Sequence, residues 1–325
     1  MKAAWYERNG AARDVLELGD MPTPTPGPGE VRVQLATSGV NPSDVKARRG
    51  RPLNAESIIP HSDGAGEIDA VGPGVDHGRV GQRVWIWNGQ WRRPFGTAAE
   101  MITLPEAQAV PLPANVDFAA GACLGIPALT AIHAVNLFGD VRGKTLIVIG
   151  AGASVGHYVT QIAKARGARV IATASASRAA HARAAGADFV IDYKAKDVAA
   201  TVKGLTAGKG ADGLIDMDLY STTSIISNGA LAPHGKIVCY GSSMQGDIPV
   251  SFPTLLWNSL TLQVFVVYEL LSKDRETAIA QLTTMLEKNS LKHAIGERFA
   301  LRDIVAAHEA VERGDIIGNV ILDIA

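Results

Sequence analysis

The sequence has 325 residues, of which 47% are hydrophobic and 19% are charged, and its formal net charge is -1. This length and composition indicate a globular chain of about two domains. Because a nearly neutral chain has no overall field that attracts nucleic acid or an anionic membrane surface, we expect a small-molecule partner and neither of those two.

The cysteines and the N-terminal residues indicate the cellular compartment of the protein. Cys123 and Cys239 are the only cysteines, and their apolar neighbours predict buried, reduced thiols. Charged residues at Glu7 and Arg8 argue against a secretory signal. No apolar run reaches the ~18 residues that a membrane-spanning helix needs. We therefore expect a cytoplasmic protein.

Residues 1 to about 112 have the pattern of an all-β domain, in which glycine and proline separate short apolar stretches. These stretches lie at residues 31–36, 66–71, 83–87 and 98–104. The proline-rich segment 22–29 is typical of turns, and strand sequence resumes directly after it. The pattern predicts a compact barrel without a long helix.

The periodicity changes after this domain, and residues 117–134 favour a helix. A strand at residues 145–149, a glycine-rich turn at 150–156 and a helix at 155–166 follow. The turn reads G-x-G-x-x-x-G, one residue longer than the common dinucleotide-binding fingerprint. Glycines let the backbone approach a pyrophosphate, and the amides at a helix N-terminus favour its negative charge.

The next strand, residues 169–174, suggests which dinucleotide is bound. An NAD site usually has Asp or Glu at the end of this strand, to hold the ribose hydroxyls. This chain instead has small polar residues, including Ser175, followed by Arg178. Small residues with a nearby arginine suit the 2′-phosphate of NADP, so we expect NADPH as the cofactor.

Strand and helix patterns then alternate, which predicts a parallel, doubly wound sheet in the dinucleotide-binding strand order. The predicted elements lie at residues 189–192, 198–205, 214–217, 223–231, 236–240 and 261–267. Two further helices, at 276–288 and 301–313, and a strand at 318–324 are expected to return to the N-terminal domain. The strand at 261–267 either pairs with the same strand of a second copy in a homodimer or lies inside one sheet.

Several motifs resemble one known family in sequence and in order. They are SGVNPSD at residues 38–44, SDGAG at 62–66, VGPGV at 71–75, GTAAE at 96–100, GIPALTA at 125–131, AGAD at 185–188, IDY at 191–193 and GSS at 241–243. With the glycine-rich turn they resemble the zinc-independent medium-chain dehydrogenases/reductases, in the quinone oxidoreductase (zeta-crystallin-like) branch. The resemblance implies an α/β fold: a GroES-like β-barrel domain, residues 1–120 completed by 268–325, and an inserted Rossmann domain, residues 121–267.

The resemblance also implies roles for individual residues. Asn41 and Thr130 would face the nicotinamide, with Asn41 orienting the substrate or the nicotinamide amide, and Asp44, Lys46 and Trp87 would join Asn41 in the substrate pocket. The other cofactor contacts implied are Gly150, Ala153, Ser154, Val155, Gly156, Ser175, Arg178, Tyr193, Gly241, Ser242, Phe265, Val266 and Asn319.

The sequence departs from the family pattern at a few of these positions. Ala153 and Ser154 stand where glycine is frequent, Asn319 where lysine is frequent, and Lys46 where tyrosine is frequent. Lys46 either changes what the pocket accepts or points to solvent.

The zinc-dependent relatives of this family use a cysteine near residue 41, a His-Glu pair near residue 62 and further cysteines. This chain has Asn41-Pro42 and Ser62-Asp63 at those places, and a lone neighbouring His61 does not supply the three or four ligands that zinc needs. We therefore expect no metal.

Without a Lewis acid to polarise a carbonyl, an electron-poor acceptor is the most suitable substrate. A quinone spreads the incoming negative charge, so the protein mainly has to position the nicotinamide and exclude water. We expect an NADPH-dependent quinone reductase that is a homodimer. The enzymatic alternative is an enone or alkenal double-bond reductase, and the non-enzymatic alternative is an RNA-binding or structural protein.

Overall fold

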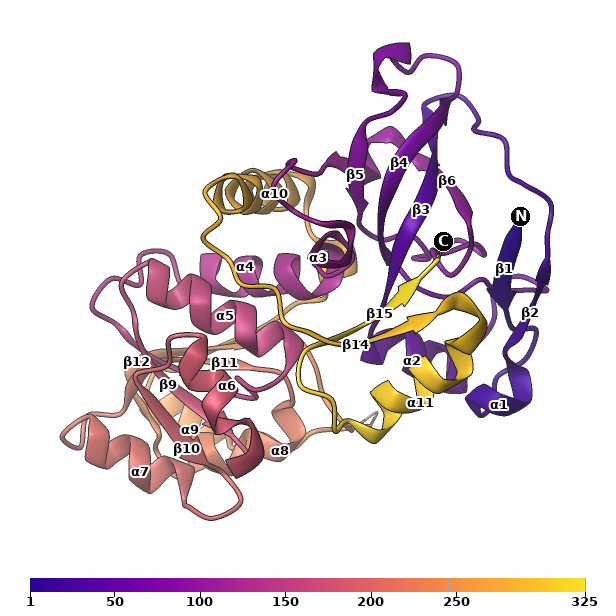
Figure 1. Ribbon diagram of the computed structural model, residues 1–325. Coiled ribbons are helices and arrows are strands. Elements are labelled where there is room, and N and C mark those ends of the chain that lie inside the picture. Colours follow the sequence, from indigo (N-terminus) through magenta and orange to yellow (C-terminus); the bar gives the residue numbers. More distant parts are fainter. Residues whose placement is uncertain (245, 325) are drawn as a thin grey trace. The chain divides into compact units, whose positions relative to one another are not determined.

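The computed structural model describes residues 1–244 and 246–324. The chain forms two compact units, Met1–Ile126 with Thr283–Ala325, and Pro127–Leu282 (Figure 1). The sequence placed these limits at residues 120 and 267. None of the helices within the described residues combines the length and the apolar character that crossing a membrane requires.

The first unit is built on a seven-stranded sheet. Its strand order is β14-β15-β3-β4-β5-β7, with β6 paired to β3, and β1 and β2 form a separate pair. The strands are β1 (Lys2–Trp5), β2 (Glu17–Asp20), β3 (Glu30–Val40), β4 (Asp63–Val71), β5 (Arg83–Ile86), β6 (Met101–Pro105), β7 (Ala109–Pro111), β14 (Ile295–Ala300) and β15 (Asn319–Asp323). The helices are α1 (Ala12–Val15), α2 (Pro42–Gly50), α3 (Phe118–Gly121) and α11 (Ile304–Arg313).

Strand β3 lies inside this sheet and pairs with β15, β4 and β6. Val31, Val33 and Leu35 alternate with more exposed residues, as in a strand with one buried face. From Ser38 to Val40 every residue is buried. The C-terminal strand β15 pairs antiparallel with this part of β3. The predicted return of the C-terminal segment to the N-terminal domain is confirmed.

The prediction of an all-β first domain was wrong for residues 42–50, which form α2. Pro42 occupies the first helical turn, where its missing N–H costs no hydrogen bond. Asn41 is the N-cap residue, and its backbone N–H donates to Asp44 Oδ2 at 2.8 Å. These local signals begin a helix directly after a strand.

The second unit is a six-stranded parallel sheet in the order β10-β9-β8-β11-β12-β13, which is the dinucleotide-binding order that the sequence predicted. Its strands are β8 (Thr145–Val148), β9 (Arg169–Ala174), β10 (Phe189–Asp192), β11 (Ala211–Asp216), β12 (Leu231–Cys239) and β13 (Thr261–Val264). Its helices are α4 (Leu129–Asn136), α5 (Ser154–Ala165), α6 (Ala179–Ala184), α7 (Val198–Leu205), α8 (Leu219–Ser227) and α9 (Phe252–Trp257), and α10 (Ser272–Glu287) runs across the limit at residue 282.

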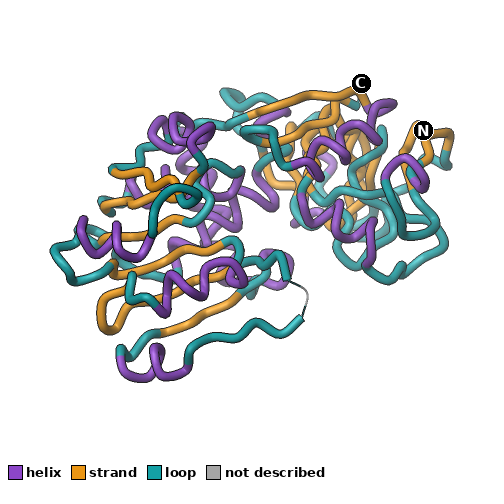
Figure 2. Tube along the Cα trace, turned by 90° about the horizontal axis from the view of Figure 1, so that it is seen from below, coloured by secondary structure: helices purple, strands orange, loops and turns teal. Residues whose placement is uncertain are grey.

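Helices cover both faces of this sheet (Figure 2). For this reason β8 is a continuous apolar run rather than an alternating one: Leu146, Ile147 and Val148 are all fully buried. Cys123 in the first unit and Cys239 in the second are buried free thiols, as the sequence predicted.

Three sequence predictions differ from the structure in detail. The last strand of the sheet ends at Val264, so residues 265–267 lie outside it. The helix expected at 301–313 begins with a 3₁₀ turn before α11. Strand β14 and helices α6 and α9 were not predicted, because each is short and has no clear apolar period.

The glycine-rich turn between β8 and α5 depends on two glycines. Gly150 has φ of +70°, which side chains other than glycine rarely adopt. At Gly156 a β-carbon would overlap the carbonyl oxygen of Gly150. The first turn of α5 can therefore pack directly on the end of β8 only if residue 156 is glycine.

We expect Gly156→Ala to lower the free energy of unfolding by about 1–3 kcal/mol, the usual effect of overpacking. Gly204→Ala is the matched control, because Gly204 lies in α7 with nothing within 4 Å of an added β-carbon. That variant should gain about 0.5–1 kcal/mol from its better helix propensity. Denaturant unfolding of both variants measures the difference, and equal stabilities would contradict the packing argument.

Candidate functional site

The carboxyl ends of the parallel strands carry most of the residues implied in cofactor binding. Helix α5 begins at Ser154, and its N-cap residue Ala153 has no side-chain acceptor for the first-turn N–H groups. Val155 and Gly156 belong to that first turn. A helix N-terminus of this kind, without a side-chain cap, suits an anionic group such as a pyrophosphate.

The end of β9 contacts the same glycine-rich turn. Thr173 accepts the N–H of Gly150 at its hydroxyl, at 3.1 Å, and the Arg178 guanidinium donates to the Gly152 carbonyl at 3.3 Å. The Ser175 and Ser177 hydroxyls lie 3.1 Å apart just before Arg178. The structure therefore brings Arg178 to the turn, with Ser175 three residues before it and no acidic side chain between Thr173 and Arg178.

A cavity of about 340 Å³ lies at this edge of the sheet. Its lining includes Gly150, Thr173 and Tyr193, and Tyr193 is about half exposed, at 51%. Ile149 lines it as well. The part of the lining that comes from the end of β11 and from α8 was not predicted: Met217, Asp218, Ser221, Thr222 and Ile225. Met217 ends a predicted parallel strand and Asp218 follows it, and this position was the signal for them, because the carboxyl ends of parallel strands share one edge.

The remaining residues of the second unit lie near the ends of β12 and β13. The Gly241 carbonyl accepts the N–H of Leu219, and the Ser242 hydroxyl accepts the N–H of Met244 at 3.0 Å. Phe265 packs edge-on against His133 of α4, with ring centroids 4.7 Å apart. The same helix carries the buried Thr130, and Val266, next to Phe265, is exposed.

In the first unit, Asn41 lies among buried carboxyl groups. Its amide Nδ2 donates to Asp63 Oδ2 at 2.9 Å, and that oxygen also accepts the N–H of Ile126 at 3.1 Å. The Asp44 carboxylate accepts the backbone N–H of Asn41. Asp63 was not among the predicted site residues, because its contact with Asn41 joins positions 22 residues apart.

Burial changes the proton affinity of both carboxyl groups. It raises the pKa of Asp44 to about 7, although the hydrogen bonds from Asn41 act in the opposite direction. Burial, and in second place the charge of Asp44, raises the pKa of Asp63 well above its usual value. Asn41 is thus held by two acids whose charged forms are disfavoured.

The other site residues expected in the first unit are Lys46, Trp87 and Asn319, and each has its own surroundings. Lys46 is exposed on α2, and Trp87 is half-buried, with its indole N–H donating to the Ala107 carbonyl at 3.2 Å. Asn319 is buried, and its amide donates to the Ala294 carbonyl at 2.9 Å. Trp85, two residues before Trp87, is fully buried in the core.

The described residues contain no group of three or more His, Cys, Asp or Glu side chains that could hold a metal ion. Where zinc-dependent relatives have a cysteine and a His-Glu pair, the present chain has Asn41 and Asp63, which bind each other. An amide and one carboxylate do not make a zinc site.

Comparison with known proteins relates this geometry to a family. Residues 27–114 match the alcohol dehydrogenase GroES-like domain, and residues 154–284 match the zinc-binding dehydrogenase domain. The quinone oxidoreductase of Pseudomonas aeruginosa is 32% identical over 327 residues, which cover 95% of each chain.

Solved structures agree over the whole chain. An NAD-dependent alcohol dehydrogenase has a TM-score of 0.88 at 30% identity, and a mycobacterial protein solved with NADPH has a TM-score of 0.88 at 28% identity, each covering 100% of both chains. The GroES-like first unit, the inserted parallel sheet and the similar proteins all indicate the same family. The chain belongs to the zinc-independent quinone oxidoreductase family of the medium-chain dehydrogenases/reductases, as its motifs indicated.

Proposed function

We propose that this protein is an NADPH-dependent quinone oxidoreductase that transfers a hydride to a quinone without zinc. In the overall reaction the quinone gains a hydride from the cofactor and a proton from water, and becomes a hydroquinone. NADPH, when bound, supplies the hydride. The protein's own residues bind the cofactor, orient the reacting groups and exclude water.

The observation that carries this proposal is the contact between Asn41 and Asp63. Alcohol oxidation in the zinc-dependent relatives needs a Lewis acid at this place, whereas here the Asn41 amide donates a hydrogen bond to the Asp63 carboxyl group. A quinone requires no Lewis acid, because its conjugated ring takes up the charge. The quinone oxidoreductase of Pseudomonas aeruginosa, similar over nearly the whole chain, supports the same choice of acceptor.

In this proposal Asn41 orients the nicotinamide amide or the substrate oxygen. Asp44 fixes its backbone by accepting its N–H at the start of α2, so the amide is carried on a rigid helix end. Thr130, Phe265 and Val266 are the proposed contacts of the nicotinamide in the second unit. Lys46, Trp87 and Asn319 remain proposals for the pocket and the cofactor.

Arg178 and Tyr193 support NADPH rather than NADH. Arg178 contacts the glycine-rich turn, and Tyr193 lines the cavity beside it. A guanidinium binds a phosphate by charge-assisted hydrogen bonds, whereas the ribose hydroxyls of NADH need an acidic acceptor that this strand end lacks. The cofactor named for one similar structure is NADPH, and another is of an NAD-dependent enzyme, so titration has to decide.

The exposed edge of the second unit supports a homodimer. Strand β13 ends the six-stranded sheet, and its outer edge is unpaired within the described residues. Apolar side chains are exposed on β13 and on the neighbouring α9: Val264 at 66%, Phe252 at 67% and Trp257 at 82%. An apolar edge strand of this kind pairs readily with a second copy. A cytoplasmic location is part of the same proposal.

The choice of cofactor is tested by titrating the protein with NADPH and NADH. We expect NADPH to bind at least about tenfold more tightly, which corresponds to roughly 1.4 kcal/mol. Arg178→Ala should weaken NADPH binding and leave NADH binding unchanged. Arg183→Ala, which removes an exposed cation from α6, is the control and should keep the preference. Equal dissociation constants for the two cofactors would refute the assignment.

The acceptor is tested with chelator-treated protein, by measuring kcat/KM for simple quinones and for α,β-unsaturated carbonyls under one set of conditions. Quinones should be reduced faster. Asn41→Ala should lower kcat roughly 10- to 100-fold while the Kd of NADPH changes little, because a lost orienting contact acts on the reacting geometry. Asn54→Ala, at an exposed position, is the control.

Each alternative has its own outcome in that assay. Faster turnover of enones than of quinones would assign the protein to the double-bond reductases. No NADPH oxidation with either class would favour the RNA-binding or structural role.

The oligomeric state is tested by light scattering. The wild-type protein should have twice the chain mass of 34.1 kDa, and Val264→Asp should be a monomer because its charge is placed on the pairing edge. Val80→Asp, which alters an exposed apolar residue of the first unit, should stay a dimer. A monomeric wild type would remove the homodimer from the proposal.

A further inference from the structure

A chain of buried polar side chains crosses the first unit outside the residues that the proposed function uses. It consists of Arg48, His308, His61, Ser38 and Thr97, all of them fully buried. Its members come from α2, α11, β3 and the segments before β4 and β6. Buried polar groups are costly unless they are paired, so a chain of this length requires a reason.

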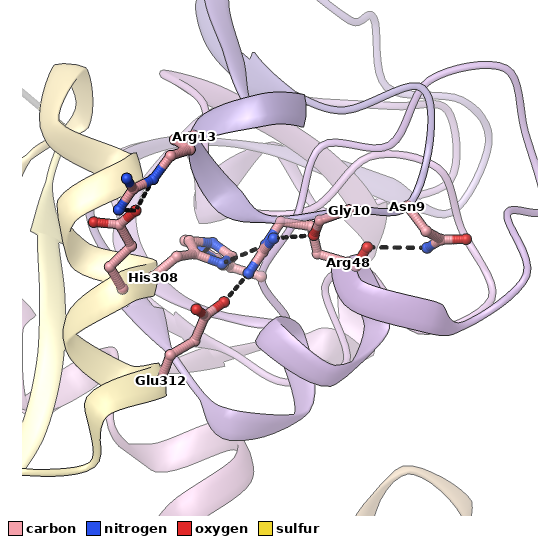
Figure 3. A network of polar contacts seen from close by, with 8 residues as sticks. Asn9, Gly10, Arg13, Arg48, His308 and Glu312 are labelled. Atoms are coloured by element: carbon pink, nitrogen blue, oxygen red, sulfur yellow. Dashed lines mark hydrogen bonds and ion pairs between the residues drawn. The ribbon is translucent and has the colours of Figure 1, made fainter.

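One end of the chain fixes the direction of every hydrogen bond in it. The Arg48 guanidinium lies against the Gly10 carbonyl, His308 and the Glu312 carboxylate, which balances its charge (Figure 3). Arginine can only donate, so His308 accepts at Nδ1, 3.4 Å from Arg48 Nε. Burial, followed by the neighbouring His61 and the charge of Arg48, keeps the pKa of His308 well below its usual value, so its ring is neutral.

The remaining protons follow from that assignment. A neutral His308 that accepts at Nδ1 carries its proton on Nε2 and donates it to His61 Nε2 at 2.9 Å. His61 then has its proton on Nδ1 and donates to the Ser38 hydroxyl at 2.9 Å. Ser38 donates to the Thr97 hydroxyl at 2.8 Å, and Thr97 donates to the Asp63 carbonyl at 2.6 Å.

The chain therefore runs in one direction and ends on the main chain of Asp63. It also holds His61, which has φ of +78° and so lies in the left-handed region that non-glycine residues occupy only under constraint. The strained residue is two positions before Asp63. The hydrogen bonds of its ring to Ser38 and His308 keep the segment leading into β4 in place.

The side chain of Asp63 faces Asn41. Its Oδ2 accepts both Asn41 Nδ2 and the N–H of Ile126. Because that oxygen accepts from the Asn41 nitrogen, the Asn41 amide cannot be turned over without placing its oxygen against the Asp63 oxygen. Asp44 holds Asn41 within the helix end, through the capping box. Asp63 is the acceptor from outside the helix that fixes the amide nitrogen.

We propose that Asp63 is a positioning residue that sets the orientation of the Asn41 amide, and that the hydrogen-bond chain from Arg48 to Thr97 holds Asp63 in place for this purpose. Its kinetic consequence rests on the proposed function, in which Asn41 orients the reacting groups. The structural claim, that Asp63 sets the orientation of the Asn41 amide, does not rest on the proposed function. The kinetic and the structural claims can therefore be tested separately.

The kinetic test is a double-mutant cycle with NADPH and the quinone that the wild type reduces fastest. Asp63→Ala should lower kcat by about as much as Asn41→Ala, roughly 10- to 100-fold, while the Kd of NADPH changes less than about twofold. The kcat of the double variant should lie within about threefold of the kcat of the slower single variant, because each change breaks the same Asn41–Asp63 hydrogen bond. Effects on kcat that multiply would overturn the proposal.

Thr37→Val is the matched control for the cycle. Thr37 is equally buried in β3, but its hydroxyl donates to the Phe118 carbonyl at 2.6 Å and not to this chain. Its effect on kcat should multiply with that of Asn41→Ala. Asp63→Asn is the conservative variant: its amide oxygen can still accept from Asn41, so kcat should stay within about threefold of wild type.

Asp63→Asn also serves if Asp63→Ala does not fold. A tenfold loss of kcat in Asp63→Asn at an unchanged melting temperature would contradict the proposal. A test without activity is a crystal structure of the Asp63→Ala or Asp63→Asn protein. Asp63→Ala should show the Asn41 amide rotated and Asp63→Asn should show it unchanged; an unmoved Asn41 in Asp63→Ala would overturn the proposal even if no acceptor is ever found.

Discussion

The need to pair buried polar groups organises the first unit. Arg48 is fully buried, and leaving its charge without a partner would cost several kcal/mol. Glu312 of α11 supplies the opposite charge, and His308 of the same helix accepts from the guanidinium. Helix α11 is thereby joined to α2, the helix whose N-cap is Asn41. The packing of the C-terminal segment and the geometry of the candidate site thus depend on the same contacts.

The second unit is governed by a different constraint, the close approach of backbone at the end of β8. With glycine at residue 156 the first turn of α5 reaches the end of the strand, and the helix dipole points at the edge of the sheet. All six strands are parallel, so their carboxyl ends share that edge. The turn after β9 and the cavity at Tyr193 lie there for the same reason. The topology favours binding of a dinucleotide, and a few side chains determine whether that dinucleotide is NADPH or NADH.

The two units contribute different kinds of information about function. The second unit resembles that of many dehydrogenases and accounts for a nicotinamide cofactor without naming an acceptor. The first unit distinguishes this chain from the zinc-dependent relatives, because Asn41 and Asp63 bind each other where a metal would need ligands. Burial raises the pKa of both neighbouring acids, so the charged forms of the two carboxyl groups beside Asn41 are disfavoured.

The sequence by itself determined the family, the Rossmann strand order, the glycine-rich turn and the small polar residues after β9, because each is written in local spacing or in the periodicity of apolar residues. It failed at α2, where proline and a capping carboxylate began a helix within strand-like sequence. Only the tertiary structure decided that Trp85 belongs to the core, that Met217 and Asp218 line the cavity, and that Asp63 holds Asn41. The physical reason is separation along the chain: His61 and His308 are 247 residues apart and meet only because β15 and α11 pack on β3 and α2, a contact that no local pattern encodes.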